Sequence, residues 1–588
     1  MDSKHVTEST SGQEDIQKTW WKEAIIYQIY PRSFQDSDGD GIGDLNGITS
    51  RLDYIQSLGV DIIWLNPIFL SPNDDNGYDI SDYREIMREF GTMEDFDRLL
   101  KEIHKREMRL VLDLVVNHTS DEHPWFEEAR KSRHNSYYNY YHWWPAEKGE
   151  PPLRLSYFDE EGNAWTYNKP TDSYYLHYFS RKQPDLNWEN PEVRQEIFDM
   201  MRFWFDKGID GFRMDSISLI AKDPSFPLID SKKYPDIFSF YAKEPRLHLY
   251  LREMNRQVLS KYDCMSVGEG SAVMVDDVAK FVDPAREELN MLYHFDAARI
   301  RNTTLPDNPE SGIDYSLIAL KKMFTEWDKA VDKGWPSIYL GNHDQPRMVS
   351  RFGSDKDEFR ALSAKMLITF LLTMRGTPYW FAGDEIGMRN IRFDHIEDYN
   401  DIDTINRYKK AKAEGKDPQA VLDEQKETGR DNARTPFQWD RSPEAGFTAG
   451  TPWLKVNPDY TWINVADEEK DPTSILNYFK KVVSFRKENP SLIYGSYHLL
   501  DAENPQSYTF LRKTGADTYL IMLNFSPKAA ISTPGIDMSN AHVLLDNYGD
   551  RSHMAPQKDI TLRPFEAIVF QLNHPVYESF IDSLDLLE

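Results

Sequence analysis

Short apolar segments rich in β-branched and aromatic residues recur along the chain, and helical patterns separate them. Their hydrophobicity is continuous rather than alternating, which is typical of strands buried on both faces of a parallel sheet. Eight such strands that alternate with helices predict a (β/α)8 barrel of the α/β class. The predicted strands lie within residues 23–34, 60–69, 109–116, 209–216, 264–270, 291–295, 336–344 and 377–385.

Two of the intervening segments carry clear helix signals. Thr92 and Asp95 have the spacing of a capping box at the start of one helix. Another helix, over 193–207, is predicted to end at Gly208, because glycine is favoured just after a helix. The apolar residues of the first helix fall on one stripe, and they are Phe96, Leu99, Leu100 and Ile103.

Two regions depart from the alternation of strands and helices. Residues 118–190, between the third and fourth strands, are too long for a loop and predict a small inserted domain. Residues 496–588 contain short alternating strands and predict an antiparallel C-terminal domain. The barrel itself is then expected over 19–117 and 191–495, and residues 1–18 are expected to be disordered.

Composition narrows the class of protein. The 588 residues include 69 basic and 97 acidic side chains, and the net charge of −28 argues against a nucleic-acid partner. Cys264 is the only cysteine, so no intrachain disulfide can form. No apolar run approaches the roughly 20 residues of a membrane helix, so no membrane partner is expected. The N-terminal residues lack the pattern of a signal peptide. We therefore expect a cytoplasmic protein, or a periplasmic one if a signal peptide has been removed.

Three acidic residues follow predicted barrel strands. Asp215 ends the fourth strand, Glu269 ends the fifth and Asp344 follows the seventh. Active sites of such barrels form at the carboxyl ends of the strands. Any one of these acids alone could be a solvated strand end, but three together would repel one another and resist burial. Arg213 shares a strand face with Asp215. The group therefore predicts an active site.

The segment “DSDGDGIGD” (36–44) contains four aspartates, and the first three of them alternate as in an EF-hand loop. Its twelfth position is Gly47 rather than glutamate, so it is not an EF-hand. Four acids this close would repel without a cation, and their hard oxygen atoms suit Ca²⁺ or Mg²⁺. An empty acidic turn is the alternative. The predicted ligands are Asp36, Asp38, Asp40, Asp44 and the carbonyl of Ile42.

Several motifs together resemble a known family. Four of them occur in the order of the signature regions of the α-amylase family (family 13) of glycoside hydrolases: “DLVVNH” (113–118), “GFRMD” (211–215), “VGE” (267–269) and “GNHD” (341–344). Three others resemble the branch that contains α-glucosidases, oligo-1,6-glucosidases and sucrose isomerases: residues 71–83, 183–188 and 429–440. The resemblance covers about residues 20 to 500. It implies a structural cation at the acidic loop.

The resemblance assigns roles to the three acids. Asp215 is implied to be the nucleophile that forms a β-glucosyl–enzyme intermediate, and Glu269 to be the acid and base. Asp344 is implied to hold the hydroxyls of the distorted sugar. A retaining mechanism needs the first two carboxyl groups about 5–5.5 Å apart, and that proximity separates their pKa values. Arg213 would keep the nucleophile ionised.

The resemblance also implies a glucose pocket. Tyr78 is expected to stack on the terminal glucose. Asp75 and Arg434 are expected to hold its far hydroxyl and close the pocket, so that the enzyme acts from the chain end. Arg430 is an alternative to Arg434, since the same motif contains both.

Four further positions match pocket residues of the family. His118 and His343 are implied to donate hydrogen bonds to the sugar hydroxyls. Phe179 and Gln183, in the inserted segment, match positions at the mouth of the pocket. Ordinary packing is the alternative for Phe179 and for Tyr78.

The implied activity is that of a retaining exo-acting α-glucosidase on short oligosaccharides or disaccharides, as a monomer or homodimer. Ser216 follows the nucleophile, where α-1,6 enzymes typically have Val and α-1,4 enzymes Ala or Thr. Together with Gly270 in place of Met, it favours α-1,4 or mixed specificity. A sucrose isomerase or transglucosidase is the alternative, although “RIRNT” (299–303) matches the isomerase loop only at Arg299. An inactive carbohydrate-binding relative is disfavoured, because all three acids are present.

Overall fold

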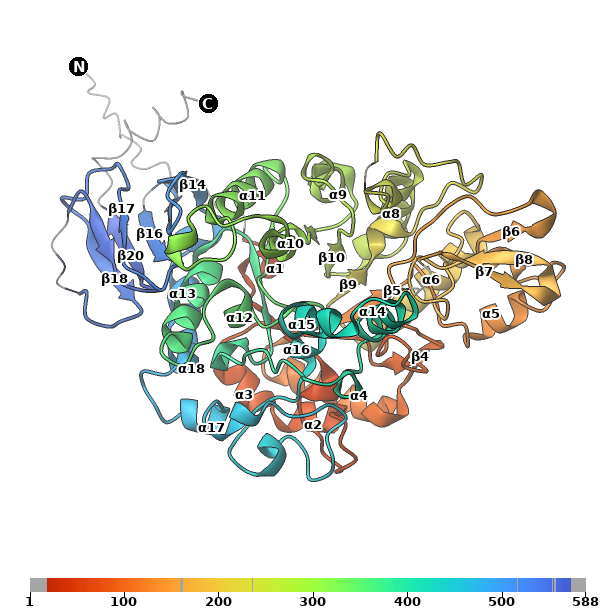
Figure 1. Ribbon diagram of the computed structural model, residues 1–588, viewed down its shortest axis with the longest axis horizontal. Coiled ribbons are helices and arrows are strands. Elements are labelled where there is room, and N and C mark those ends of the chain that lie inside the picture. The colour runs from red at the N-terminus through yellow and green to blue at the C-terminus, as the bar shows by residue number, and fades with distance from the viewer. Residues whose placement is uncertain are drawn as a thin grey trace, which may run out of the picture.

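The computed structural model describes residues 18–158, 162–234, 236–515, 517–552, 554 and 557–572. Eight parallel strands form a nearly closed barrel at its centre (Figure 1). Each lies within a predicted segment, so the predicted barrel is confirmed. The strands are β1 (Ile26–Ile29), β2 (Ile62–Leu65), β5 (Arg109–Val115), β9 (Gly211–Asp215), β10 (Met265–Glu269), β11 (Met291–Tyr293), β12 (Ser337–Ile338) and β13 (Thr377–Phe381).

The strand order is β11-β10-β9-β5-β2-β1-β13-β12. A hydrogen bond joins β12 to β11, the two outer strands of this order: the Ser337 hydroxyl donates to the backbone carbonyl of Leu292 over 3.0 Å. The pairing of β5 with β9 places Val115 opposite Asp215. The carboxyl ends of neighbouring strands are therefore level, and Asp215 and Glu269 emerge at the same end of the barrel.

Helices surround the barrel, and their ends follow the local signals in the sequence. The capping box of Thr92 and Asp95 begins α4, and the stripe predicted for it is buried. α6 ends at Gly208, whose φ of 109° requires the conformational freedom of glycine. The longer helices of this layer are α4 (Met93–Lys105), α6 (Pro191–Lys207), α8 (Arg246–Gln257), α11 (Leu317–Ala330), α13 (Arg360–Thr373) and α18 (Ile475–Glu488). Among the described residues, no helix is long and apolar enough to cross a membrane.

The segment between β5 and β9 contains its own small sheet at one end of the molecule (Figure 1). A buried ion pair of 3.1 Å joins Lys222, after β9, to Asp185 of the inserted segment. The same ammonium group donates to Asn117 at the end of β5. The insertion is thus fixed to the strand ends. Its elements include α5 (Pro124–Ala129), β6 (Trp143–Pro145), β7 (Trp165–Asn168) and β8 (Ser173–Leu176).

An antiparallel sheet forms the C-terminal domain, as predicted. Two buried arginines, Arg486 and Arg512, donate to backbone carbonyls where this domain meets the barrel, and they share the carbonyl of Leu492. Residues 1–17, of the segment expected to be disordered, and 573–588 lie outside the described residues. The sheet strands are β14 (Ser496–Leu500), β15 (Ser507–Lys513), β16 (Thr518–Asn524), β18 (His542–Asp546) and β20 (Ala567–Leu572), and β17 (Ala530–Ser532) pairs with β19 (Ile560–Leu562).

The group of helices that follows β13 was not predicted from the sequence. After β13, the helices α14 (Ile402–Ala413), α15 (Pro418–Thr428) and α16 (Asp431–Arg434) lie across the face of the barrel that Figure 1 shows. They bring Arg430 and Arg434 over the strand ends. This segment therefore completes the candidate site from a part of the chain remote from the barrel strands.

Candidate active site

One buried arginine binds three carboxylates at the carboxyl ends of the strands. Arg213 Nη1 lies 2.7 Å from Asp113 Oδ1 and 2.8 Å from Asp215 Oδ1. Its Nη2 contacts Glu269 Oε2. Arg213 has no exposed surface, and the other three are nearly as buried. A single guanidinium thus holds the candidate nucleophile and the candidate acid next to each other.

The balance of charge favours a proton within this cluster. Three carboxylates share one cation, so full ionisation would leave a buried excess of negative charge. Burial, then the neighbouring Glu269, raise the pKa of Asp215 well above its usual value, although Arg213 lowers it. Burial likewise raises the pKa of Asp113 to about 6. Near neutral pH the cluster can hold a proton for general acid catalysis.

Glu269 is held by hydroxyl groups as well as by Arg213. Tyr293 donates to its Oε2 over 3.2 Å, and Ser271 donates to its Oε1 over 2.7 Å. Ser216 Oγ lies 3.5 Å from the same Oε1. These contacts fix the carboxyl group at the wall of the cavity. Tyr293 and Ser271 were missed by sequence analysis, although Ser271 follows the “VGE” motif closely.

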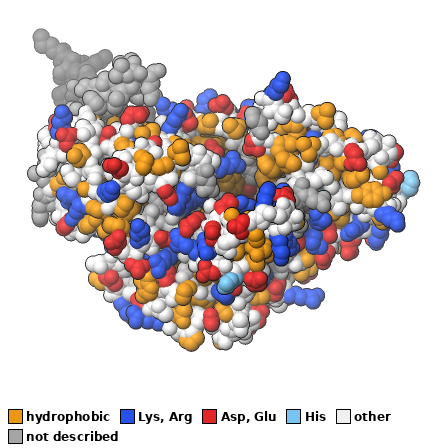
Figure 2. Space-filling model, viewed as in Figure 1, with side chains coloured by type: hydrophobic (Ala, Val, Ile, Leu, Met, Phe, Trp, Pro, Cys, Tyr) orange, Lys and Arg blue, Asp and Glu red, His pale blue; other side chains and the backbone are white. Residues whose placement is uncertain are grey.

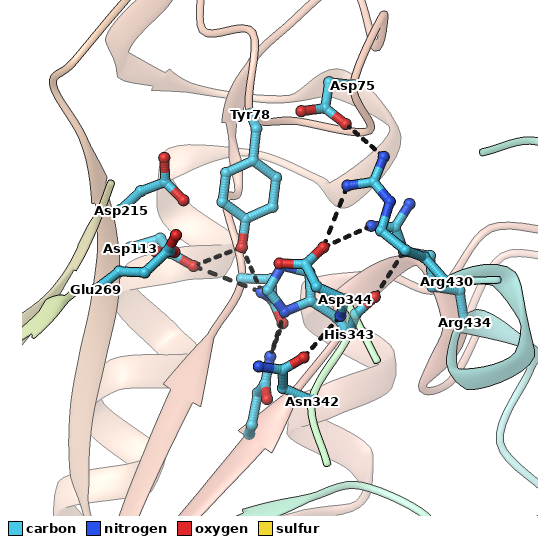
Figure 3. A network of polar contacts seen from close by, with 12 residues as sticks. Asp75, Tyr78, Asp113, Asp215, Glu269, Asn342, His343, Asp344, Arg430 and Arg434 are labelled. Atoms are coloured by element: carbon cyan, nitrogen blue, oxygen red, sulfur yellow. Dashed lines mark hydrogen bonds and ion pairs between the residues drawn. The ribbon is translucent and has the colours of Figure 1, made fainter. Parts of the chain in front are cut away.

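Asp344 lies among cations, and Figure 3 shows the network around it. Its Oδ1 is 3.2 Å from Arg430 and 3.0 Å from Arg434. Burial alone would raise the pKa of Asp344, but these guanidinium groups contribute to a net lowering below the usual range. Asp344 is therefore ionised at neutral pH and accepts hydrogen bonds, which suits a role in holding sugar hydroxyls.

The expected pair between Asp75 and Arg434 is not formed. Asp75 instead pairs with Arg430, whose Nη2 lies 3.3 Å from Asp75 Oδ1 (Figure 3). Arg434 donates to the carbonyl of His343 and to Asp344. Asp401, at the start of α14, is the reason: it binds Arg430 Nε over 2.7 Å and directs that side chain towards Asp75. The partner of Asp75 is therefore Arg430, the residue predicted from the sequence as the alternative to Arg434.

Tyr78 and His343 form a stacked pair at the base of the site. Their ring centroids are 5.2 Å apart and the planes differ by 6°. Tyr78 donates to Asp113 over 3.0 Å. Gln28 Nε2 lies 2.8 Å from His343 Nδ1 and can donate to it, which leaves the proton on Nε2. That Nε2 is buried without a hydrogen bond and lies 3.2 Å from Asp344 Oδ2, outside hydrogen-bond geometry. It can therefore donate to a ligand.

Two residues of the inserted segment, Gln183 and Phe179, lie next to Asp75 and His118 in the candidate site. Gln183 Nε2 lies 3.2 Å from Asp75 Oδ2 and 3.2 Å from His118 Nε2. Phe179 packs on the ring of His118 with centroids 5.1 Å apart. Burial lowers the pKa of His118 to about 3, so its imidazole is neutral at working pH. The inserted segment thus supplies one side of the predicted pocket.

A cavity of about 460 Å³ opens from these residues to the surface. Glu269, Asp344 and Arg430 line its inner part, and Phe179 lines its side. Arg430 also pairs with Asp75. The volume suits a short saccharide.

Ser216, directly after Asp215, has a φ of 42° in the left-handed region. A residue other than glycine rarely adopts this conformation, and such strain is frequent at active sites. The turn brings the serine hydroxyl to the Glu269 side of the nucleophile. Ser216 thus follows one candidate catalytic acid in the sequence and lies beside the other.

The acidic loop gathers three of its four aspartates. One carboxylate oxygen from each of Asp36, Asp38 and Asp40 lies within 4.8 Å of the others. Asp44 does not belong to this group: it caps α2 (Leu45–Ser50) by accepting from the amide of Gly47 over 2.7 Å. Burial, and then the neighbouring aspartates, raise the pKa of Asp40, although a backbone amide lowers it. The three carboxylates fit a hard divalent cation.

The chain is similar to several known proteins. The family model described as alpha amylase, catalytic domain, matches residues 28–495. An oligo-1,6-glucosidase of Parageobacillus thermoglucosidasius is 51% identical, over 95% of this chain and 100% of that protein. The oligo-1,6-glucosidase of Bacillus cereus is 49% identical, with coverage of 95% and 100%. The crystal structure of the trehalulose synthase MutB from Pseudomonas mesoacidophila MX-45 is 43% identical with a TM-score of 0.89, covering 94% of this chain and 99% of that chain.

Proposed function

Because the chain belongs to the α-amylase family of glycoside hydrolases, we propose that it is a retaining α-glucosidase. It releases α-glucose from the non-reducing ends of short α-glucosides. The observation that carries this proposal is the contact of Arg213 with both Asp215 and Glu269 at the inner end of a cavity. A retaining glycosidase needs two neighbouring carboxyl groups with different protonation states.

In the proposed first step, Asp215 attacks the anomeric carbon and the glycosidic bond breaks. Glu269 gives its proton to the leaving oxygen, so the departing group is neutral. In the second step Glu269 removes a proton from water, which attacks the β-glucosyl ester and restores the α configuration. Arg213 stabilises the ionised form of Asp215 when Glu269 is protonated.

The glucose-binding roles are proposed from the positions of the polar groups. Asp344 and the Nε2 proton of His343 face the site and would bind hydroxyls of the reacting sugar. The ring of Tyr78 would stack on the glucose, and Asp75 with Arg430 would bind its far hydroxyl. A rigid ion pair there leaves no room for another sugar, which supports action from the chain end.

The enzyme is proposed to cleave α-1,6 bonds among others, since two relatives that are 51% and 49% identical to this chain are named oligo-1,6-glucosidases. Ser216 and Gly270 still favour a broader specificity that includes α-1,4 bonds, and this stays a prediction. The small Ser216 side chain lies beside Glu269, where the leaving group departs.

A second candidate function is the transfer of glucose to fructose, as in a sucrose isomerase. The structural similarity to a trehalulose synthase favours it, and Arg299 lines the cavity. The rest of the “RIRNT” segment departs from the isomerase loop. We therefore propose hydrolysis as the main reaction of sucrose.

We also propose that the acidic loop binds a structural Ca²⁺ or Mg²⁺ through Asp36, Asp38 and Asp40. Asp44 accepts hydrogen bonds from the amides of Gly47 and Ser37, and its carboxylate could add a further ligand while it keeps them. The loop lies beside residues 446–453, because Thr448 donates to Asp36. A cation there would hold two distant segments together without entering the reaction.

Proton NMR of early reaction mixtures tests the proposal. With isomaltose, maltose and maltohexaose as substrates, the first product should be α-glucose. Initial β-glucose would contradict the retaining mechanism, and maltose or longer fragments as the first products of maltohexaose would contradict the closed pocket. Isomaltulose or trehalulose as the main product from sucrose would favour the second candidate.

A further inference from the structure

Two arginines on one wall of the cavity have no carboxylate partner among the described residues. Arg299 on α10 (Asp296–Thr303) and Arg351 on α12 (Met348–Phe352) both line the cavity. Within the described part of the chain, neither side chain makes an ion pair. Two other arginines of the cavity have carboxylate partners: Arg407 pairs with Glu424 over 2.7 Å, and Arg301 of α10 pairs with Asp314. Arg299 and Arg351 differ from them in lacking such a partner.

Arg351 is the more unusual of the two. Only 5% of its surface is exposed, and its Nε has no hydrogen-bond partner. Its Nη1 donates to the side-chain oxygen of Gln345, a neutral group. A buried guanidinium is costly unless an anion neutralises it. The protein therefore maintains an unneutralised cation at the wall of its substrate cavity.

Arg299 adds a second cation to the same wall. It is exposed. Burial raises the pKa of Tyr339 above its usual range, and Arg351 and Arg299 both lower it, so both guanidinium groups lie near the same phenol. Figure 2 shows Lys and Arg side chains around a hollow on this face of the molecule. An anion between Arg299 and Arg351 would be attracted by both.

The wall formed by Arg299 and Arg351 lies on the leaving-group side of the catalytic acids. The pair of Asp75 and Arg430 closes the glucose end. Glu269, the proposed donor to the leaving oxygen, lines the same cavity as Arg299 and Arg351. The two arginines therefore lie on the side that the leaving group occupies.

We propose that this wall binds an anionic group of the substrate, so that the enzyme prefers α-glucosides whose leaving group carries a phosphate or a carboxylate. The inference rests on the proposed α-glucosidase function and specifies its substrate class. Guanidinium groups bind phosphate and carboxylate through paired, charge-assisted hydrogen bonds. The ionised Asp215 and Asp344 at the glucose end disfavour an anion there, so the charged group is expected at the Arg299 and Arg351 wall.

Trehalose and trehalose 6-phosphate are a suitable pair of probes. Trehalose is symmetrical, so the glucose without phosphate can enter the closed end and the phosphate then lies on the leaving glucose. Both compounds are used to inhibit hydrolysis of p-nitrophenyl α-glucoside, and the apparent inhibition constant reports binding whether or not they are cleaved. We expect the phosphorylated compound to bind at least about tenfold more tightly, and the preference to fall in high salt.

Variants of the two arginines test the assignment. Arg299→Gln and Arg351→Gln should each lower the preference for the phosphate about fivefold or more. Arg407→Gln, a cavity arginine that has a carboxylate partner, should keep it. Arg299 is exposed, so its variant supports the test even if Arg351→Gln fails to fold.

The outcomes separate the two proposals. No hydrolysis of p-nitrophenyl α-glucoside or isomaltose by the unaltered enzyme would overturn the proposed function. Normal hydrolysis with equal binding of trehalose and trehalose 6-phosphate would overturn only the anionic preference. An equal loss of preference in Arg407→Gln would show a general charge effect and would also overturn the assignment to Arg299 and Arg351.

Discussion

Arg213 and Asp215 lie two residues apart on β9, and a hydrogen bond of 2.8 Å joins their side chains in the interior of the barrel. Alternate residues of a strand point to the same side, so the pairing follows directly from the local sequence. The same guanidinium binds Asp113 and Glu269 from the two neighbouring strands. One cation thereby makes it possible to bury three acids together.

Asp215→Asn should remove nearly all hydrolysis, by at least about a thousandfold in kcat, because an amide cannot form the glycosyl ester. The variant should fold, since the amide relieves repulsion within the cluster. Steady-state kinetics on p-nitrophenyl α-glucoside and circular dichroism measure both effects. Asp223→Asn, a change in the loop beyond the same strand, serves as the control. Near-normal turnover of Asp215→Asn would exclude Asp215 as the nucleophile.

Glu269→Gln should slow natural disaccharides far more than aryl glucosides with acidic leaving groups. A phenolate of low pKa departs without full protonation, whereas a sugar alkoxide needs the proton. The ratio of kcat/KM for p-nitrophenyl α-glucoside to that for isomaltose should therefore rise by about a hundredfold, within the usual size of general acid catalysis. Equal losses on both substrates would argue against Glu269 as the acid.

The pH dependence of binding should reflect Asp75. Burial raises the pKa of this carboxyl to about 6, although Arg430 and Arg434 lower it. Below pH 6 the group takes up a proton and loses its attraction to Arg430, so KM should rise as the pH falls from about 7 to 5. Asp75→Asn should give a high KM that no longer changes over this range, whereas Asp74→Asn should keep the normal profile. An unchanged profile in Asp75→Asn would assign the titration to another group.

The same pKa makes a prediction about stability. The folded-state pKa of Asp75 exceeds its usual value of 3.8, so the folded protein binds this proton more tightly than the unfolded chain. The contribution of Asp75 to stability is therefore lost as the pH rises from about 4 to about 6. Above pH 6 the ionised group costs on the order of 3 kcal/mol. Asp75→Asn should raise the melting temperature at pH 7 but not at pH 4. A lower melting temperature at pH 7 would contradict this sign.

The barrel and the three acids could be predicted because both depend on local patterns. Buried strands are continuously apolar, and their last residues are fixed at the rim of the barrel. The partner of Asp75 could not be assigned, since Arg430 and Arg434 are four residues apart and lie on the same side of a helical turn. Asp401, from the start of α14, selects Arg430. The choice depends on a contact between segments that no short motif contains.

The acidic loop shows the same limit in another form. An aspartate before a helix can be either a ligand or an N-cap, and both uses leave the same mark in the sequence. Asp44 serves as the cap of α2, whereas Asp36, Asp38 and Asp40 converge. Tyr293 and Ser271 were missed for a related reason. Their hydroxyl groups reach Glu269 only through the packing of the strand ends.

The convergence of Asp36, Asp38 and Asp40 predicts that a divalent cation stabilises the fold. A cation that binds only the folded form at a hundred times its dissociation constant contributes about 2.7 kcal/mol. For a chain of 588 residues, each kcal/mol corresponds to about 1 °C. A chelator should therefore lower the melting temperature by about 2 °C, and added calcium or magnesium should restore it. Elemental analysis of the purified protein would identify the ion.

Asp40→Ala should abolish the response of the melting temperature to chelator and metal, because it removes one of the three converging carboxylates. Asp332→Ala, an exposed aspartate outside the loop, should keep the full response. Asp40 is remote in sequence from the catalytic acids, so Asp40→Ala measured well below its melting temperature should still hydrolyse p-nitrophenyl α-glucoside. Asp36 is held by the amides of Asp38, Gly39 and Gly41, so the loop can keep its shape in this variant. A melting temperature indifferent to chelator in the unaltered protein, with no metal found by elemental analysis, would show that the three carboxylates form an empty acidic turn.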